Sequence, residues 1–336
     1  MIRTDVLVVG GGPAGTTCAW KLRKLGIDVL LIEKASYPRN KPCAGWISPE
    51  VLEDLEIQTG EYPYPLTVLN EIDVSIRGLR FRVKTRVFTI RRTEFDAWLA
   101  ERSGVPIHQH EVHSIVQTDG GYLVDGIYFC HYLVGAGGTF CPVARTFFRS
   151  LKPPEARSRI VTLEEEFLTG NSMQTTIQID KVSQQSRDRS CHLWFFQDGF
   201  PGYAWYVPKE GGWLNVGLGG ASEKLKQRGV SIHRYWERLI QHLEALHLIG
   251  EEEFHPQGYV YYLRGRKPIL QQGSAFIIGD AAGLATSDMG EGIGPAVRSG
   301  LIAAEAIATQ RPIDYRRIRR WSEPWPFGWL LGRSYR

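Results

Sequence analysis

The first fifteen residues lead from an apolar run directly into a cluster of glycines, and this feature restricts the fold most. The run at 5–9, DVLVV, has the continuous apolar pattern of a strand buried on both faces of a parallel sheet. The next residues, GGGPAG, place Gly10, Gly12 and Gly15 on the pattern G-x-G-x-x-G. The first glycine permits a tight turn, the second lets a pyrophosphate approach the backbone, and the third lets a helix pack on the strand. The sequence therefore predicts a strand, a turn and a helix that bind a dinucleotide.

The segment that follows completes a nucleotide-binding unit. Residues 16–25 have helical character and end at Gly26, and a second buried strand at 28–32 leads to Glu33. An acidic residue at the end of this strand suits a hydrogen bond to ribose hydroxyls. A glycine turn without a ligand is the alternative, but the flanking strand, helix, strand and glutamate favour the fingerprint. We expect the cofactor to contact Gly10, Gly12, Pro13, Ala14, Gly15, Glu33 and Lys34.

The composition is that of an ordinary globular chain. Its 336 residues are enough for two domains, and 43% are hydrophobic and 23% charged. The five cysteines form no C-x-x-C pair, which argues against a disulfide framework and favours a reducing compartment. The chain enters an apolar strand almost at once and has no run long enough to span a bilayer, so we expect a cytoplasmic protein. A net charge of +4 is too small to indicate a nucleic-acid partner.

Two later glycine-rich segments distinguish between dinucleotides. VGAGG at 134–138 follows an apolar strand, and FIIGDAAGLATSDMGEGIGPAVRSG at 276–300 has the pattern of a strand, a loop and a helix from 293 to 308. With the fingerprint, they resemble the FAD-dependent reductase and aromatic-hydroxylase superfamily up to about residue 310. The resemblance implies FAD, with Asp280 on a ribityl hydroxyl and the helix start aimed at the flavin, where it favours the reduced anion. It adds to the expected FAD site Gly137, Asp280, Gly290, Gly292 and Ile293.

The stretch RRTEFDAWL at 91–99 also resembles this superfamily, in which an arginine precedes a helix lying over the cofactor. Thr93 suits the N-cap of that helix. The resemblance implies that an arginine approaches the FAD phosphates or ribityl chain; we assign Arg92, and a solvated basic pair with Arg91 is the alternative. We also place Val112 beside FAD, whereas the histidines around it, in IHQHEVH, suit a strand surface rather than a metal site.

The stretch GYAWYVPKEGGWLNVGLGG at 202–220 narrows the family. It resembles the Y-x-W-x-F-P-K and V-G-x-G motifs of the geranylgeranyl reductase family, with Val207 in place of the usual aromatic residue. Tyr203 and Trp205 are two apart on a strand and so share a face, where flat side chains can line an apolar pocket. We assign both as active-site residues; core aromatics of a sheet are the alternative.

The stretch KPCAGW at 41–46 resembles the C-G-G-G-type loop of the same family. The resemblance implies that Cys43, Ala44 and Gly45 lie beside the flavin ring and that Cys43 is an active-site thiol. A plain buried cysteine is the alternative. Ala44 and Trp46 stand where the family has glycines, and their bulk implies a smaller or differently shaped substrate.

The expected architecture is α/β: a Rossmann-like FAD-binding domain with an inserted antiparallel β-sheet substrate domain. The pattern at 71–89 alternates and turns at Arg77 and Gly78, and 158–220 contains several strand-like runs. We assign 1–70, 90–150 and 265–310 to the FAD-binding domain, 71–89 and 151–264 to the substrate domain, and 311–336 to a basic and aromatic C-terminal tail. The tail suits either an anionic membrane surface or packing on the body.

These features predict an FAD-dependent oxidoreductase that reduces carbon–carbon double bonds of an isoprenoid or other apolar or lipid substrate. The flavin would deliver hydride while a nearby acid supplies the proton. No second complete dinucleotide fingerprint is present, so the sequence does not identify the electron donor; NADPH and a reduced ferredoxin are the two candidates. One alternative is a flavin-dependent monooxygenase or halogenase. Another is a catalytically silent FAD-binding protein, which Ala44, Trp46 and the short segment after Gln310 would suit.

Overall fold

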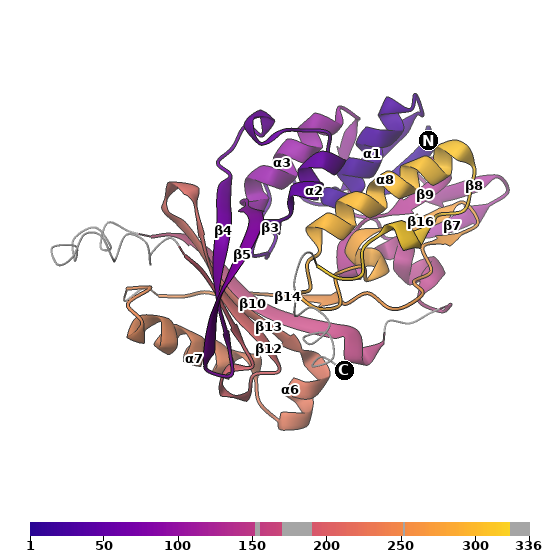
Figure 1. The fold of residues 1–336 in the computed structure, drawn as a ribbon. Helices are drawn as coiled ribbons and strands as arrows, with labels where there is room; N and C mark the ends of the chain where they lie inside the picture. Colours follow the sequence, from indigo (N-terminus) through magenta and orange to yellow (C-terminus); the bar gives the residue numbers. More distant parts are fainter. Residues whose placement is uncertain (152–154, 170–189, 251–252, 323–336) are drawn as a thin grey trace.

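A computed structural model describes residues 1–151, 155–169, 190–250 and 253–322 (Figure 1). In this part of the chain, two eight-stranded sheets carry helices on their outer faces. The helices are α1 (Pro13–Lys24), α2 (Pro49–Asp54), α3 (Arg92–Ser103), α6 (Ser222–Arg228), α7 (Ile232–Ala245) and α8 (Ile293–Thr309). The strands are β1 (Ile2–Val9), β2 (Val29–Glu33), β3 (Trp46–Ile47), β4 (Thr67–Ile76), β5 (Leu79–Thr89), β6 (Ile107–Gln109), β7 (Ile115–Thr118), β8 (Gly121–Val124), β9 (Tyr128–Gly135), β10 (Arg159–Leu168), β11 (Cys191–Phe195), β12 (Gly202–Lys209), β13 (Trp213–Ala221), β14 (Gln257–Tyr262), β15 (Gln271–Gln272) and β16 (Ala275–Ile277).

The first sheet has a parallel centre and holds the N-terminal fingerprint. Its order is β15-β16-β9-β1-β2-β6, and the hairpin β7–β8 joins it through β9. Successive residues of β1 alternate between its two faces. Val6 and Val8 pack against α1 and α8, whereas Leu7 and Val9 pack against the hairpin side. Because both faces are covered, every position of this strand from Val6 to Val9 is apolar, which explains the run that opens the sequence.

The second sheet is mostly antiparallel, in the order β14-β10-β13-β12-β11-β4-β5-β3. The hairpin β4–β5 turns at Arg77 and Gly78, which have φ angles of 49° and 88° as a tight two-residue turn requires. The turn predicted there is confirmed. Helix α7 covers one face, where its Leu239 and Leu243 pack with Tyr206 of β12. The other face, which carries Trp205, looks toward the first sheet (Figure 1).

The predicted mixed α/β fold with an added antiparallel sheet is confirmed. The predicted α8 at 293–308 agrees with Ile293–Thr309, and α7 begins after Ser231, whose hydroxyl accepts a hydrogen bond from the backbone N–H of His233 at 3.2 Å. The N-cap prediction for Thr93 is wrong. Helix α3 begins two residues earlier because Arg91 is the capping residue and its carbonyl accepts the N–H of Phe95 at 2.9 Å.

The predicted tail is described only as far as residue 322, so Trp325, Phe327, Trp329 and Leu330 lie outside the described residues. Within the described part, Arg317 pairs with Glu305 of α8 at 2.6 Å, and Arg319 lies 3.6 Å from Glu50 of α2. None of the helices in the described ranges combines the length and apolar character that a membrane span needs.

Candidate active site

A cavity of about 660 Å³ lies between the two sheets. The first sheet contributes the carboxyl ends of β1, β2 and β9, and the second contributes β10 and β12. Ligands of open α/β sheets bind outside the carboxyl ends of the strands, so this is the expected place for a dinucleotide. The cavity is lined by most of the residues assigned from sequence: Gly10, Gly12, Pro13, Ala14, Glu33, Lys34, Cys43, Ala44, Arg92, Val112, Gly137, Tyr203, Trp205, Asp280, Gly290, Gly292 and Ile293.

Two assigned glycines, Gly15 and Gly45, do not line the cavity and instead allow close packing behind it. A Cβ on Gly15 would lie 1.9 Å from the carbonyl oxygen of Gly10, so a side chain there would push α1 away from the turn. Gly45 has φ +74°, and its Cβ would lie 2.0 Å from the carbonyl oxygen of Ile90. Both positions therefore shape the site through the backbone rather than by facing the cavity.

The turn after β1 is built to receive an anion. Gly12 is the N-cap residue of α1, no side chain caps this helix start, and a Cβ there would meet only Arg39 Nη2, at 3.4 Å. The first N–H groups of a helix and its dipole favour a phosphate at such a place. Glu33 is held at the end of β2, where its carboxylate accepts hydrogen bonds from the backbone N–H groups of Gly11 at 2.6 Å and Ala35 at 3.1 Å.

Arg92 and Arg91 lie in different environments. Arg92 lines the cavity and makes two hydrogen bonds to Asp96, at 2.7 and 2.8 Å, while Arg39 approaches the same carboxylate at 3.0 Å. Two guanidinium groups thus share one carboxylate, which leaves one positive charge for a phosphate. Arg91 instead pairs with Glu166 at 2.9 Å, outside the cavity lining. A solvated basic pair does not describe either residue.

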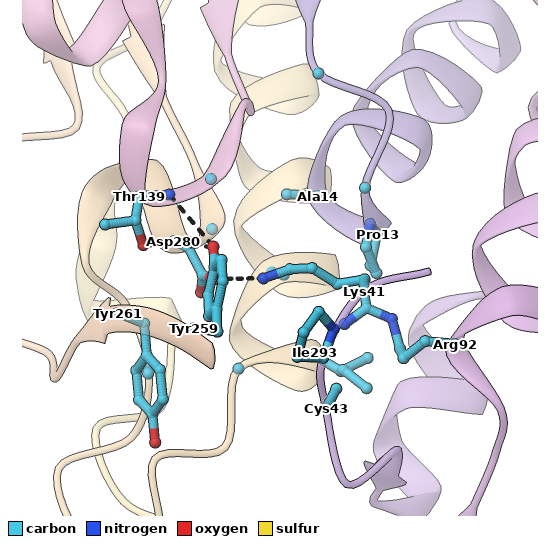
Figure 2. Close-up of a pocket in the computed structure, with 18 of the residues that line it drawn as sticks. Pro13, Ala14, Lys41, Cys43, Arg92, Thr139, Tyr259, Tyr261, Asp280 and Ile293 are labelled. Atoms are coloured by element: carbon cyan, nitrogen blue, oxygen red, sulfur yellow. Dashed lines mark hydrogen bonds and ion pairs between the residues drawn. The ribbon is translucent and has the colours of Figure 1, made fainter. Parts of the chain in front are cut away.

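Lys41 lies beside Arg92 and reaches across the cavity to Tyr259 and Asp280 (Figure 2). Its Nζ lies 2.9 Å from the ring centroid of Tyr259 and 3.8 Å from Asp280 Oδ2. The Tyr259 hydroxyl donates to the same carboxylate oxygen at 3.2 Å. Burial lowers the pKa of Lys41 to about 8, partly offset by the charge of Asp280. This part of the cavity therefore holds a cation, Lys41, whose charge depends on pH.

The loop before α8 also comes close to the second sheet. Gly290 has φ +67°, and a Cβ there would lie 2.3 Å from the Tyr261 hydroxyl, so this position accepts only glycine without rearrangement. Gly292 is the N-cap residue of α8, and no side chain caps it. Gly292 and Ile293 line the cavity, so the uncapped helix start lies at its edge.

Aromatic residues of β12 form the wall opposite the nucleotide turn. Tyr203 and Trp205 both line the cavity, with ring centroids 5.7 Å apart. The Tyr203 hydroxyl donates to the carbonyl oxygen of Met289 at 2.6 Å, and Trp205 Nε1 donates to Asn215 Oδ1 at 2.7 Å. Trp205 lies opposite Gly217 of β13, where a Cβ would be 2.3 Å from the indole ring. The first glycine of the V-G-x-G motif is therefore needed because the indole lies over it.

The Cys43 loop meets this wall. The backbone N–H of Cys43 donates to Glu164 Oε1, and Asn215 Nδ2 donates to the Cys43 carbonyl oxygen at 3.4 Å. The thiol Sγ accepts the N–H of Gly45 at 3.3 Å, and the side chain is only partly buried. The second sheet thus holds the loop so that Cys43 faces the cavity (Figure 2).

Comparisons with known proteins give the family. A family model described as FAD binding domain matches residues 3–59. The chain is 31% identical over 322 residues to an uncharacterized protein of Methanosarcina barkeri, covering 92% of this chain and 76% of that protein. It is 27% identical over 345 residues to digeranylgeranylglycerophospholipid reductase 1 of Methanothermobacter thermautotrophicus, covering 94% and 80%. The chain belongs to the geranylgeranyl reductase family of FAD-dependent oxidoreductases.

Solved structures show the same fold. A geranylgeranyl bacteriochlorophyll reductase-like protein from Thermoplasma acidophilum matches 100% of this chain and 82% of its own length, with a TM-score of 0.75 at 19% identity. The flavin-dependent brominase Bmp2 matches 98% and 83%, with a TM-score of 0.66 at 18% identity. The fold is thus common to reductases and halogenases, and the sequence relatives place this FAD-dependent oxidoreductase in the geranylgeranyl reductase family.

The cavity residues fit FAD. The open backbone at Gly12 and the charge of Arg39 and Arg92 would hold the pyrophosphate, and Glu33 would accept from the adenosine ribose. Asp280 also lines the cavity and offers an acceptor for the ribityl chain. These groups address the separate parts of one extended dinucleotide.

Several cavity residues were missed by the sequence analysis. His110, Glu111 and His113 line the cavity, because β6 ends at Gln109 and the chain then leaves the strand; a strand surface was wrong for them. Their side chains form no metal site, and no group of three or more ligands occurs in the described residues. Other lining residues that the sequence analysis missed include Arg39, Lys41, Thr139, Glu164, Tyr259, Tyr261 and Glu291. Tyr259 and Tyr261 alternate on β14 and could have been found as a second aromatic pair.

Proposed function

We propose that this enzyme reduces carbon–carbon double bonds of an isoprenoid or other apolar substrate. The observation that carries the proposal is the apolar and aromatic wall of the second sheet beside the Cys43 loop, opposite the nucleotide turn. The second sheet contributes Val87, Leu193, Tyr203 and Trp205, and the loop before α8 adds Met289. Bound FAD would supply the hydride for this reaction.

The chain's own residues bind and orient the substrate in this proposal. The Tyr203 hydroxyl donates its hydrogen bond to Met289 O, and Trp205 Nε1 donates to Asn215 Oδ1. The ring faces of both residues are therefore available for apolar contact with a substrate. A substrate covering these rings would exclude water from the Cys43 side of the cavity. Ala44 and Trp46 also line the cavity and narrow it relative to a loop made of glycines.

The names of relatives support an isoprenoid substrate. The relative from Methanothermobacter is a digeranylgeranylglycerophospholipid reductase, and a further relative is a menaquinone reductase of Mycolicibacterium smegmatis. We carry the apolar, isoprenoid character of such substrates over to this chain. We further propose that 71–89 and 151–264 form the substrate side, and 1–70, 90–150 and 265–310 the FAD side.

The test uses the purified protein reduced chemically under anaerobic conditions. Addition of a polyprenyl alkene should reoxidise the flavin, whereas its saturated analogue should not. Trp205→Ala should raise the concentration of alkene needed for half-maximal rate, because it removes one face of the apolar wall. Leu69→Ala, another buried apolar change on the same face of the second sheet, controls for general loss of packing. Failure of every polyprenyl alkene to reoxidise the flavin would refute the proposal.

A flavin-dependent halogenase or monooxygenase is the second candidate, and the fold shared with a brominase favours it. Such an enzyme requires oxygen, so it would show no turnover in the anaerobic assay and would form a halogenated or hydroxylated product in air. Lys209, which follows the proline of the YAWYVP stretch, is buried and pairs with Glu166 outside the cavity lining. A catalytically silent protein would bind FAD and show neither reaction.

We also propose a donor and a location. The electron donor is NADPH or a reduced ferredoxin, and flavin reduction rates with each donor distinguish them. The protein is cytoplasmic and contacts an anionic membrane surface through the basic and aromatic segment 311–336. Co-sedimentation with anionic but not neutral vesicles, lost on truncation after residue 310, would support this contact. Equal sedimentation of both forms would refute it.

A further inference from the structure

Three consecutive glutamates on β10 lie in three different environments. Glu165 points away from the cavity and accepts the backbone N–H of His255 at 2.5 Å. Glu166 pairs with Lys209 and with Arg91. Glu164 lines the cavity, is only 6% exposed, and forms no ion pair with any lysine, arginine or histidine in the described part of the chain. A carboxyl group buried without a paired cation is rare and is a candidate for chemistry.

The register of the second sheet sets Glu164 beside the aromatic wall. Glu164 lies opposite Gly217, which in turn lies opposite Trp205. Since Gly217 has no side chain, nothing stands between the indole and the stem of Glu164, whose Cβ lies 2.8 Å from where a Gly217 Cβ would be. The carboxyl group then reaches the Cys43 loop and accepts its backbone N–H at Oε1. The acid therefore lies between the apolar wall and the Cys43 loop.

The surroundings of Glu164 favour its protonated form. Lys209 and Arg91 are matched by Glu166 and by Glu94, which Arg91 contacts at 3.0 Å. The charges of these two cations and two carboxylates already sum to zero. An ionised Glu164 would therefore add a buried negative charge with no cation to balance it. Burial raises the pKa of Glu164 to about 7, against the opposing effects of Lys209 and of the Cys43 N–H. A group that titrates near neutral pH can both hold a proton and release it.

We propose that Glu164 is the proton donor of this active site. The inference rests on the proposed function, because hydrogenating a carbon–carbon double bond requires one hydride and one proton. The hydride brings two electrons to one alkene carbon. The other carbon forms its C–H bond with the proton as the O–H bond of Glu164 breaks, and the carboxylate then regains a proton from water. The alkene is reduced by two electrons, and the hydride donor is the only group oxidised.

Glu164→Gln separates proton donation from positioning. The amide oxygen can still accept the Cys43 N–H, but the side chain has no proton to release at neutral pH. Glu165→Gln, on the opposite face of the same strand, is the matched control. Glu164→Ala removes both the proton and the acceptor. Each variant is compared with wild type in FAD content, thermal melting and anaerobic single-turnover reoxidation by a polyprenyl alkene.

We expect Glu164→Gln to bind FAD and, at neutral pH, to melt at or above the wild-type temperature, because the neutral amide avoids the cost of ionising a buried carboxyl group. It should nevertheless reoxidise about a hundredfold or more slowly, which is the usual loss for a general acid. Glu165→Gln should keep the wild-type rate. Infrared difference spectra of the oxidised protein, recorded without substrate over a pH series, should show a protonated carboxyl band that disappears near neutral pH. In Glu164→Gln this band should lose the part that Glu164 contributes and keep the part from Glu291, whose pKa burial also raises to about 7. The Glu165→Gln spectra should retain the whole band.

Several results would overturn the inference. A wild-type rate in Glu164→Gln combined with a slow Glu164→Ala would mean that Glu164 only holds the Cys43 loop. Burial also raises the pKa of Glu291 to about 7, with Asp288 and Glu50 nearby, and this residue lines the cavity as well. A large loss in Glu291→Gln and none in Glu164→Gln would move the role to Glu291. A wild-type protein that reduces no alkene would refute the proposed function and this role together, whereas an active wild type with an equally active Glu164→Gln refutes the role alone.

Discussion

Two glycines of the fingerprint should respond to alanine in opposite ways. In Gly15→Ala the new Cβ would lie 1.9 Å from the Gly10 carbonyl oxygen, so α1 must move away from the turn. Overpacking of this kind costs about 1–3 kcal/mol, and at about 2–4 °C per kcal/mol the melting temperature should fall by about 2–12 °C. In Gly12→Ala the nearest atom is Arg39 Nη2 at 3.4 Å, and the backbone is extended, so the fold should tolerate the methyl group. This methyl group would instead enter the space that the pyrophosphate needs.

Gly12→Ala should therefore weaken FAD binding and leave the melting temperature of the FAD-free protein unchanged. Loss of one hydrogen bond between a backbone N–H and a charged phosphate costs about 1.5–3 kcal/mol, or about a 10- to 150-fold rise in Kd. The assay is calorimetric melting of the FAD-free proteins together with titration of each with FAD. Gly60→Ala, where a Cβ would meet no atom within 4 Å, is the control. Wild-type FAD affinity in Gly12→Ala, or an unchanged melting temperature in FAD-free Gly15→Ala, would refute this account of the turn.

Three further predictions concern the rest of the site. Cys43→Ser and Cys43→Ala should keep FAD and stability but slow single-turnover reoxidation about a hundredfold if the thiol positions the reacting complex. An unchanged rate with a lower melting temperature would mean a packing role. Asp96→Ala leaves Arg92 and Arg39 unpaired and should cost about 3–5 kcal/mol in urea unfolding, and wild-type stability would contradict the shared ion pair. Folding raises the pKa of Glu164 from 4.5 to about 7. The free energy of unfolding that depends on its protonation is therefore fully present below pH 4.5, and about 3 kcal/mol of it is lost as pH rises through 7. Between pH 4.5 and 7 the free energy of unfolding of Glu164→Gln should fall less than that of wild type. Equal falls in the two proteins would contradict the raised pKa of Glu164.

The FAD-binding half could be predicted because its signals are local. A fingerprint, a strand-end glutamate and the glycine loop before α8 each need particular residues at fixed spacing, and nearly all of them line one cavity. Gly15 and Gly45 show the limit of this reasoning. Their patterns mark them as necessary, but only the structure shows that they act by close backbone approach behind the site.

The acid on β10 could not be predicted because its role depends on strand register. A run of three glutamates at 164–166 suggests a solvated edge, and sequence alone does not say which of them faces inward. Glu164 pairs with Gly217, and Gly217 pairs with Trp205, across the three strands β10, β13 and β12. These pairings join residues that are far apart in the sequence. Arg91 and Arg92 also differ in how far away their partners lie. Arg91 pairs with Glu166 on β10, which sequence spacing does not reveal, whereas Arg92 pairs with Asp96 four residues along the same helix.

One measurement tests the central claim, that this FAD-dependent oxidoreductase reduces alkenes, most directly. The protein is first reduced with two electrons per FAD. It is then mixed with a polyprenyl alkene in the strict absence of oxygen, and the product is identified by mass spectrometry. We expect reoxidised flavin and one product per FAD that has gained two hydrogen atoms. Flavin that stays reduced until oxygen is admitted, with a product that has gained oxygen or halogen, would contradict the account.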